Sequence, residues 1–210
     1  MVVQLDRLMR DVRVALDHNM NSTPLADLGD VDTLSLDDII RSKVLEGVEQ
    51  VHKAAPYHLL ETGHNFGDAV YWGELESGWV LLPSDFMRLV VFEMDDWERA
   101  VYSAISVDDQ EYEQQRSRYK GIRGTSQKPI CAIATRPEGR VLEFYSCKST
   151  DAQVSRAVYI PYPKIVDDSV DVSERCYQAV VYTVAGLTLV ALGEVEQSKS
   201  LFELAKENLV

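Results

Sequence analysis

The histidines of this chain are its first candidates for catalysis or metal binding. His52, His58 and His64 are spaced six apart, which places them on no common helical face and matches no zinc pattern such as HExxH. Only His18 remains beside them. We therefore expect ordinary surface or packing histidines, and the sequence predicts no catalytic, cofactor-binding or metal-binding residue.

Carboxylates are the second candidate chemistry, because they gather in three clusters. The clusters are Glu93, Asp95, Asp96 and Glu98; Asp108, Asp109, Glu111 and Glu113; and Asp167, Asp168 and Asp171. A metal-dependent nuclease could use such carboxylates, but it would also need basic phosphate clamps, and no spacing matches a calcium loop with its glycine. Solvated acidic faces are the simpler interpretation, and a nuclease or other small enzyme stays open as the alternative.

Composition limits the function classes. The 210 residues include 21 Lys and Arg against 34 Asp and Glu, a net charge of −13, which argues against a protein that grips nucleic acid through its phosphates. Hydrophobic residues make up 46%, as in globular domains. Cys131, Cys147 and Cys176 are an odd number without a CxxC pair, and the N-terminus has no signal-peptide pattern, so we expect reduced thiols and no secretion.

Residues 176–193 form the only stretch long and uncharged enough to be considered as a membrane-spanning helix. These 18 residues carry no formal charge, which is close to the lower limit for a spanning helix. The stretch contains polar residues and two glycines, is flanked mainly by acidic residues and has no Lys/Arg-rich side. It therefore predicts the central helix of a core.

Charge is segregated in the middle of the chain. The acidic stretch 93–113 is followed by residues 114–128, here called the basic stretch, which holds five basic residues and no acidic one. The five are Arg116, Arg118, Lys120, Arg123 and Lys128. We expect a mobile loop that docks on an acidic surface of a partner or of another copy of this protein.

Hydrophobic periodicity predicts helices at both ends of the chain and strands between them. Helices are expected over 4–17, over 35–53 after a capping box at Ser35, and over 173–209 with a division at Gly193; residues 18–34 predict a loop. The middle predicts a strand at 78–82, a short helical turn at 85–89, a strand at 89–94 and a hairpin over 130–147. Another β-type run, AVYIPYP, could add a strand. The hairpin turn consists of Arg136, Pro137, Glu138, Gly139 and Arg140.

These elements predict the α+β class in a single domain. The helical core is expected to comprise 1–64 and 173–210, the N-terminal helices and the C-terminal helix pair, and the β-rich middle 65–172 inserts an antiparallel hairpin or small sheet.

Two segments resemble a known family. The first contains Leu82, Pro83, Asp85, Phe86, Arg88 and Leu89, followed by Val90, Val91 and Trp97. The second is the terminal helix pair, in which a helix rich in small residues leads into ALGEVEQSKSLFELA at 191–205. Together they resemble the head-to-tail connector, or adaptor, proteins of tailed bacteriophages, with a β-rich elaboration as in the longer podovirus-like members.

The resemblance implies a structural protein and not an enzyme. Family members form a dodecamer, a ring beneath the portal whose copies are joined by heterologous contacts. This ring extends the DNA channel and joins the tail. The implied partners are other copies, the portal and tail or further ring proteins. DNA passes without sequence-specific binding, and no cofactor, metal or membrane is involved. The implied location is the head–tail junction of the virion, and the host cytoplasm during assembly. We expect contacts from the basic stretch and the hairpin tip 136–140.

Overall fold

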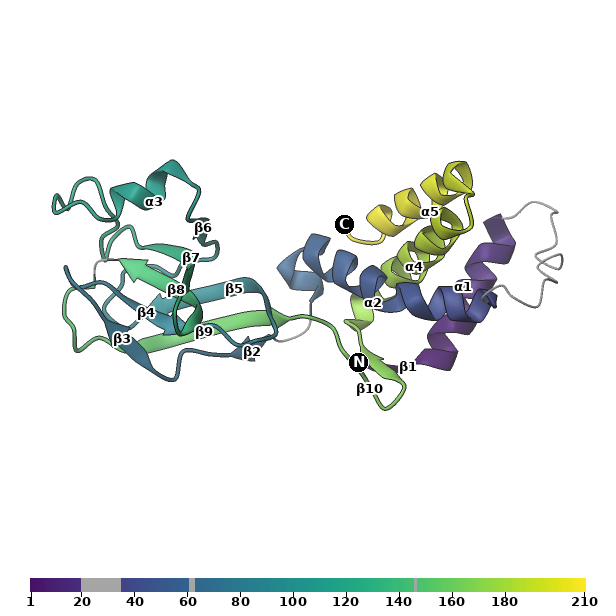
Figure 1. Cartoon of the computed structure of the whole chain (residues 1–210), viewed down its shortest axis with the longest axis horizontal. Coiled ribbons are helices and arrows are strands. Elements are labelled where there is room, and N and C mark those ends of the chain that lie inside the picture. The colour runs from purple at the N-terminus through teal and green to yellow at the C-terminus, as the bar shows by residue number, and fades with distance from the viewer. Residues whose placement is uncertain (20–34, 61–62, 146) are drawn as a thin grey trace. The chain divides into compact units, whose positions relative to one another are not determined.

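The protein is described by a computed structural model that covers residues 1–19, 35–60, 63–145 and 147–210 (Figure 1). Most of the predicted loop 18–34 lies outside the described residues. The chain divides into two compact units. The helical unit comprises Met1–Thr62 and Pro163–Val210, and the β-rich unit comprises Gly63–Tyr162. The α+β class predicted from the sequence is confirmed.

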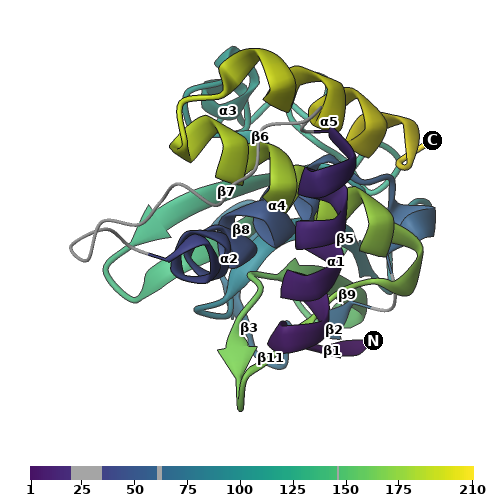
Figure 2. The same ribbon diagram turned by 90° about the vertical axis from the view of Figure 1, so that its right-hand side faces the viewer.

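Four α-helices build the described part of the helical unit. They are α1 (Leu5–Asn19), α2 (Leu36–Ala54), α4 (Tyr177–Ala191) and α5 (Val195–Glu207). The helix α4 contacts each of the other three (Figure 2), which explains why its sequence is apolar nearly all round. No helix among the described residues has the length and hydropathy that crossing a membrane requires.

Small residues let the helices approach closely. A Cβ atom added to Gly47 of α2 would lie 2.5 Å from the Val184 side chain of α4, and one added to Gly186 would lie 2.8 Å from the Phe202 ring. Such distances fall below van der Waals contact, so larger side chains at either glycine would separate the helices.

The ends of the helices follow the sequence signals. The Ser35 side chain accepts a hydrogen bond from the Asp38 backbone N–H, and the Asp38 carboxylate accepts one from the Ser35 backbone N–H, which confirms the predicted capping box. Gly193 separates α4 from α5 with φ +87°, a left-handed conformation that favours glycine. Residues 173–176 turn through a short 3₁₀ helix, Glu174–Cys176, before α4 begins.

A small sheet belongs to the helical unit and was not predicted. Its strand order is β1 (Val2–Gln4), β11 (Ser169–Asp171), β10 (Ile165–Val166). Val3 and Val170 pair with each other and are buried in the helical core. The helical unit therefore resumes at Pro163, ten residues before the boundary that the sequence indicates, because this sheet packs on the helices.

The described residues of the β-rich unit form two sheets. One has the order β3 (Val70–Trp72), β4 (Gly78–Leu81), β8 (Gly139–Tyr145), β7 (Ile130–Arg136), β6 (Ile105–Ser106). The other has the order β2 (His64–Asn65), β9 (Val154–Pro161), β5 (Phe86–Met94). The predicted hairpin is β7 and β8, which pair antiparallel from Ile130↔Tyr145 to Arg136↔Gly139.

The core of the β-rich unit is aromatic. The centroid of the Phe92 ring lies 5.7–6.1 Å from the ring centroids of Phe66, Trp97 and Phe144. The predicted helical turn at 85–89 is wrong, because β5 begins at Phe86 and pairs with β9. Pairing buries Phe86 against Tyr159 in a stacked contact, and this long-range contact overrides the local helical signal.

Candidate interaction surface of the β-rich unit

The basic stretch follows the short helix α3 (Gln110–Gln114) and is fixed at its start by a buried glutamine. The Gln115 side chain donates to the Glu111 carbonyl at 2.8 Å and accepts from the Gly124 N–H at 2.8 Å. These two bonds tie the beginning of the stretch to its middle. The sequence predicts a mobile loop here, whereas the structure folds the stretch into turns joined by side-chain hydrogen bonds.

Arg123 is the second anchor, although the sequence suggests it as a partner contact. Its side chain is 2% exposed and lies 3.5 Å from the Glu76 carboxylate. It also donates to the Leu75 carbonyl at 3.1 Å. Both acceptors belong to the turn between β3 and β4, where Leu75 and Glu76 have positive φ. Arg123 therefore holds the basic stretch against its own unit.

A third attachment lies at the end of the basic stretch. The Glu98 N–H donates to the Ser126 carbonyl at 2.9 Å, and the Arg99 side chain donates to the Gln127 carbonyl at 2.8 Å. Thr125 and Lys128 exchange backbone hydrogen bonds. The stretch is thus held at both ends, and residues 116–122 lie between the anchors.

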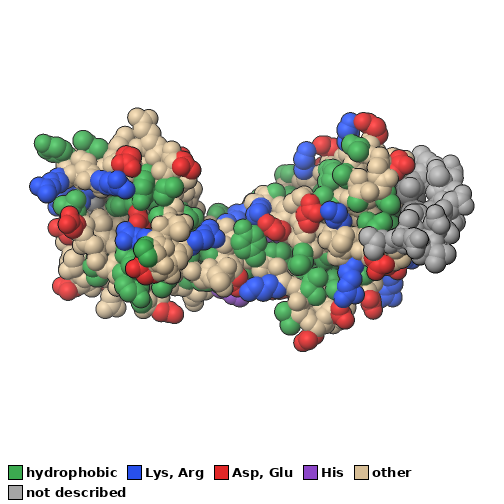
Figure 3. Space-filling view, viewed as in Figure 1, with side chains coloured by type: hydrophobic (Ala, Val, Ile, Leu, Met, Phe, Trp, Pro, Cys, Tyr) green, Lys and Arg blue, Asp and Glu red, His purple; other side chains and the backbone are tan. Residues whose placement is uncertain are grey.

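The segment 116–122, here called the exposed tip, combines positive charge with apolar side chains. Tyr119 is 75% exposed and Ile122 is 51% exposed. Arg118 and Lys120 are exposed and form no ion pair with a described residue, whereas Arg116 lies 3.5 Å from Glu113. Figure 3 shows basic and apolar side chains together over the end of the unit that carries α3. Tyr and Arg are enriched at the centres of protein interfaces.

Glu143 organises the sheet face beside α3. Its carboxylate is buried and accepts hydrogen bonds from Tyr145 at 2.7 Å, from Tyr112 at 3.0 Å and from the Arg136 guanidinium at 2.6 and 2.9 Å. Burial alone would raise the pKa of Glu143, but these hydrogen bonds outweigh it and lower the pKa below its usual value. Since Tyr112 belongs to α3, the buried carboxylate connects α3 to the sheet.

The same network raises the pKa of its tyrosines. Burial and then the negative charge of Glu143 raise the pKa of Tyr112. Burial and then the hydrogen bond to Glu143 raise the pKa of Tyr145 well above its usual value. Both phenols therefore remain protonated donors at neutral pH.

The arginines of the hairpin tip are bonded within the unit. Arg136 pairs with Glu143 and lies 5.2 Å from the centroid of the Trp79 ring, which in turn stacks on Tyr71. Arg140 donates to the Phe86 carbonyl at 3.3 Å. Pro137 and Glu138 form the exposed turn of the tip, and Gly139 follows with φ +133°, as the sequence indicates.

The predicted contact residues therefore fall into separate groups. Arg116, Arg118 and Lys120 lie together on the exposed tip, Arg123 is an internal anchor, and Lys128 is exposed near the end of the basic stretch. The hairpin tip forms a further group, in which Arg136 shares the Glu143 carboxylate with Tyr112 of α3. Tyr119 and Ile122 are not among the predicted contact residues, although two large apolar residues in a polar, basic run are a signal that could have identified them.

The described part of the chain contains no set of side chains suited to bind a metal ion. No group of three or more His, Cys, Asp or Glu side chains there could hold a metal ion. The three cysteines are buried and free of disulfide bonds. Burial, followed by the nearby Asp96 carboxylate, raises the pKa of Cys147 to about 12, so its thiol stays neutral.

No protein-family model and no curated protein matches the chain.

Proposed function

We propose that this protein is a structural head-to-tail connector of a tailed bacteriophage, which forms a ring of copies beneath the portal and joins it to the tail. The observation that carries the proposal is the exposed tip, a basic and apolar segment anchored on both sides. Anchoring reduces the entropy that a contact segment loses on binding, so the tip is pre-organised for an interface.

Charge supports a contact between different surfaces of neighbouring copies. The helical unit contains 19 acidic and 10 basic residues, whereas the basic stretch contains five basic residues and no acidic one. A ring needs heterologous contacts, in which one patch meets a different patch on the next copy. We infer that the exposed tip docks on the acidic helical unit of a neighbouring copy, where opposite charges favour the encounter and fix its register.

The net negative charge also suits the wall of a channel through which DNA passes. A wall with excess negative charge repels phosphates and does not retain the duplex. We therefore propose that acidic residues outnumber Lys and Arg on the channel-facing surface. A map of the assembled ring in which Lys and Arg predominate on that surface would contradict this part of the proposal.

Electron microscopy of the protein mixed with its portal tests the connector. We expect a ring of copies stacked on the portal. A protein that stays off the portal and instead cleaves DNA in the presence of Mg²⁺ would support the nuclease alternative and overturn the proposal. A monomer in isolation is compatible with both, so the portal must be present.

Charge reversal tests the exposed tip within the same assay. The variant R118E/K120E, and K120E alone, should reduce the fraction of portals that carry a ring, because both side chains are exposed and unpaired within the described structure. The matched control is K148E, since Lys148 is an exposed lysine of the same unit at 3.9 Å from Glu98. If K120E and K148E assemble equally well, the tip is not the contact, whereas the ring itself would remain.

A further inference from the structure

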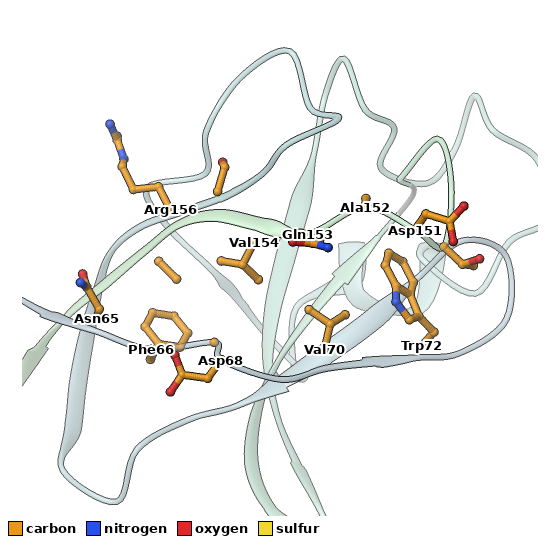
Figure 4. A pocket seen from close by; sticks show the side chains of 14 residues that line it. Asn65, Phe66, Asp68, Val70, Trp72, Asp151, Ala152, Gln153, Val154 and Arg156 are labelled. Carbon is orange, nitrogen blue, oxygen red and sulfur yellow. The ribbon is translucent and has the colours of Figure 1, made fainter.

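A groove separate from the exposed tip opens on the β-rich unit (Figure 4). It lies between residues 65–72, which include the connection from β2 to β3, and residues 150–157, which include the start of β9. Its volume of about 790 Å³ is within the range of about 300–1,000 Å³ found for ligand pockets. The groove is therefore large enough for a short segment of another molecule.

Two strand edges border this groove. The strand β9 pairs with β5 along one of its edges. Along its other edge, only Tyr159 and Val158 of β9 pair with the described strand β2. The Phe66 N–H then donates to the Ala157 carbonyl at 3.2 Å, and towards Val154 no described strand continues the row. The strand β3 pairs only with β4 among the described strands. Strand edges of this kind can accept an added strand.

The side chains of the groove suit an extended occupant. Val70, Trp72 and Val154 are partly exposed and point into the space between β9 and the 65–72 segment (Figure 4). The Phe66 side chain is buried and packs edge-on against Phe86. Successive side chains of a strand point to opposite faces, so an added strand would direct every second side chain towards the exposed parts of Val70, Trp72 and Val154, within a lining that is otherwise largely polar.

Charge defines the occupant further. Three charged side chains line the groove: Asp68, Asp151 and Arg156. Arg156 lies 4.0 Å from Glu93 and donates to the Tyr102 hydroxyl at 3.4 Å. Neither Asp68 nor Asp151 forms an ion pair within the described structure, and both are exposed. The uncompensated charge is therefore negative and favours a cationic side chain.

We propose that this groove binds an extended segment of a different protein, apolar at alternate residues and carrying Lys or Arg, by strand addition to β9. The segment would continue the row that β2 begins and, like β2, would run antiparallel to β9. A second copy of this chain is a poor source, because Gln115 and Arg123 hold its basic stretch in turns. The proposal does not depend on ring formation.

A designed peptide tests the groove on the full chain. The probe is a Lys-Val-Thr-Val-Lys-Val amide that carries fluorescein on its N-terminus, and its binding is measured by fluorescence anisotropy. We expect saturable binding that D68N and D151N each weaken about two- to fivefold, the range for an exposed ion pair. The matched control D108N removes an exposed carboxylate elsewhere in the unit and should bind as the unchanged protein does.

Two further peptides separate strand addition from simple charge attraction. A version methylated on alternate backbone nitrogens keeps its charge but loses the N–H donors along one edge, chosen as the edge that would pair with β9, so it should not bind. The peptide Glu-Val-Thr-Val-Glu-Val should bind more weakly. Hydrogen exchange should slow over 154–157 with the Lys peptide alone. The proposal is overturned if the Lys peptide shows no saturable binding up to about 1 mM, or if the methylated peptide binds equally well.

Discussion

The helical unit and the β-rich unit are stabilised by different kinds of contact. The helical core is largely aliphatic and draws on both ends of the chain, from Val3 and Leu8 to Leu189 and Leu201. The β-rich core is aromatic, and its surface segments are attached by buried polar side chains such as Gln115, Arg123 and Glu143. Apolar contacts need only the right volume, whereas polar anchors need a particular partner. The β-rich unit therefore depends more on individual residues.

The largest expected effects come from truncating one core at a time. Phe144→Ala removes a fully buried ring from the β-rich core and Leu189→Ala removes a fully buried side chain from α4. We expect losses of about 3–5 and about 2–5 kcal/mol in unfolding free energy, respectively. Hydrogen exchange in denaturant, resolved by unit, measures each loss. A uniform loss across both units in either variant would show that the two cores do not unfold separately.

The buried carboxylate gives the next effect and a pH dependence. The variant E143Q removes the charge that Tyr145, Tyr112 and Arg136 share, and we expect a loss of about 1–3 kcal/mol at pH 7. Because the folded pKa of Glu143 is lowered, its contribution is present at neutral pH and is lost as pH falls through that pKa, below about 4.5. Urea unfolding at pH 7 and below pH 4 measures this.

The control for the carboxylate is E138Q, at an exposed position of the same hairpin. As the pH is lowered, the unfolding free energy of E138Q should fall as much as that of the unchanged protein. The unfolding free energy of E143Q should fall less. Identical pH profiles for E143Q and E138Q would mean that Glu143 does not stabilise the β-rich unit through its charge.

An effect of similar size but more local is expected at Gln115. Gln115→Ala leaves the Gly124 N–H without its acceptor, at a cost of about 1–3 kcal/mol for a buried unsatisfied donor. The cost should appear as faster hydrogen exchange over the basic stretch and not in the aromatic core. Gln114→Ala is the neighbouring control, since Gln114 is exposed. Equal exchange in both variants would contradict the role of Gln115 as an anchor.

The smallest effect tests the helical unit. Ser35→Ala removes the side-chain oxygen that accepts from the Asp38 N–H, and we expect a loss of about 0.5–2 kcal/mol. Ser42→Ala is the control, because Ser42 is exposed within α2 and alanine is the better helix former. Thermal unfolding followed by circular dichroism should lower the midpoint for S35A and leave it unchanged or slightly higher for S42A.

Local signals predicted the helical unit well and the β-rich unit in part. The capping box at Ser35, the break at Gly193 and the hairpin around Gly139 each depend on a few neighbouring residues, and the structure contains all three. The pairing of β1 with β11 joins residues about 170 apart in sequence, so no short window could predict that pairing. The same limit explains the wrong helical turn at 85–89.

The candidate surfaces show the same division. The sequence by itself identified the five basic residues of 114–128, the net charge of −13 and the charge-free helix, since these are properties of composition and spacing. Only the tertiary structure decided that Arg123 is an internal anchor, that Tyr119 and Ile122 are exposed, and that two strand edges border a groove. Exposure and strand pairing depend on contacts between residues that are distant in sequence, and a local sequence pattern does not specify those contacts.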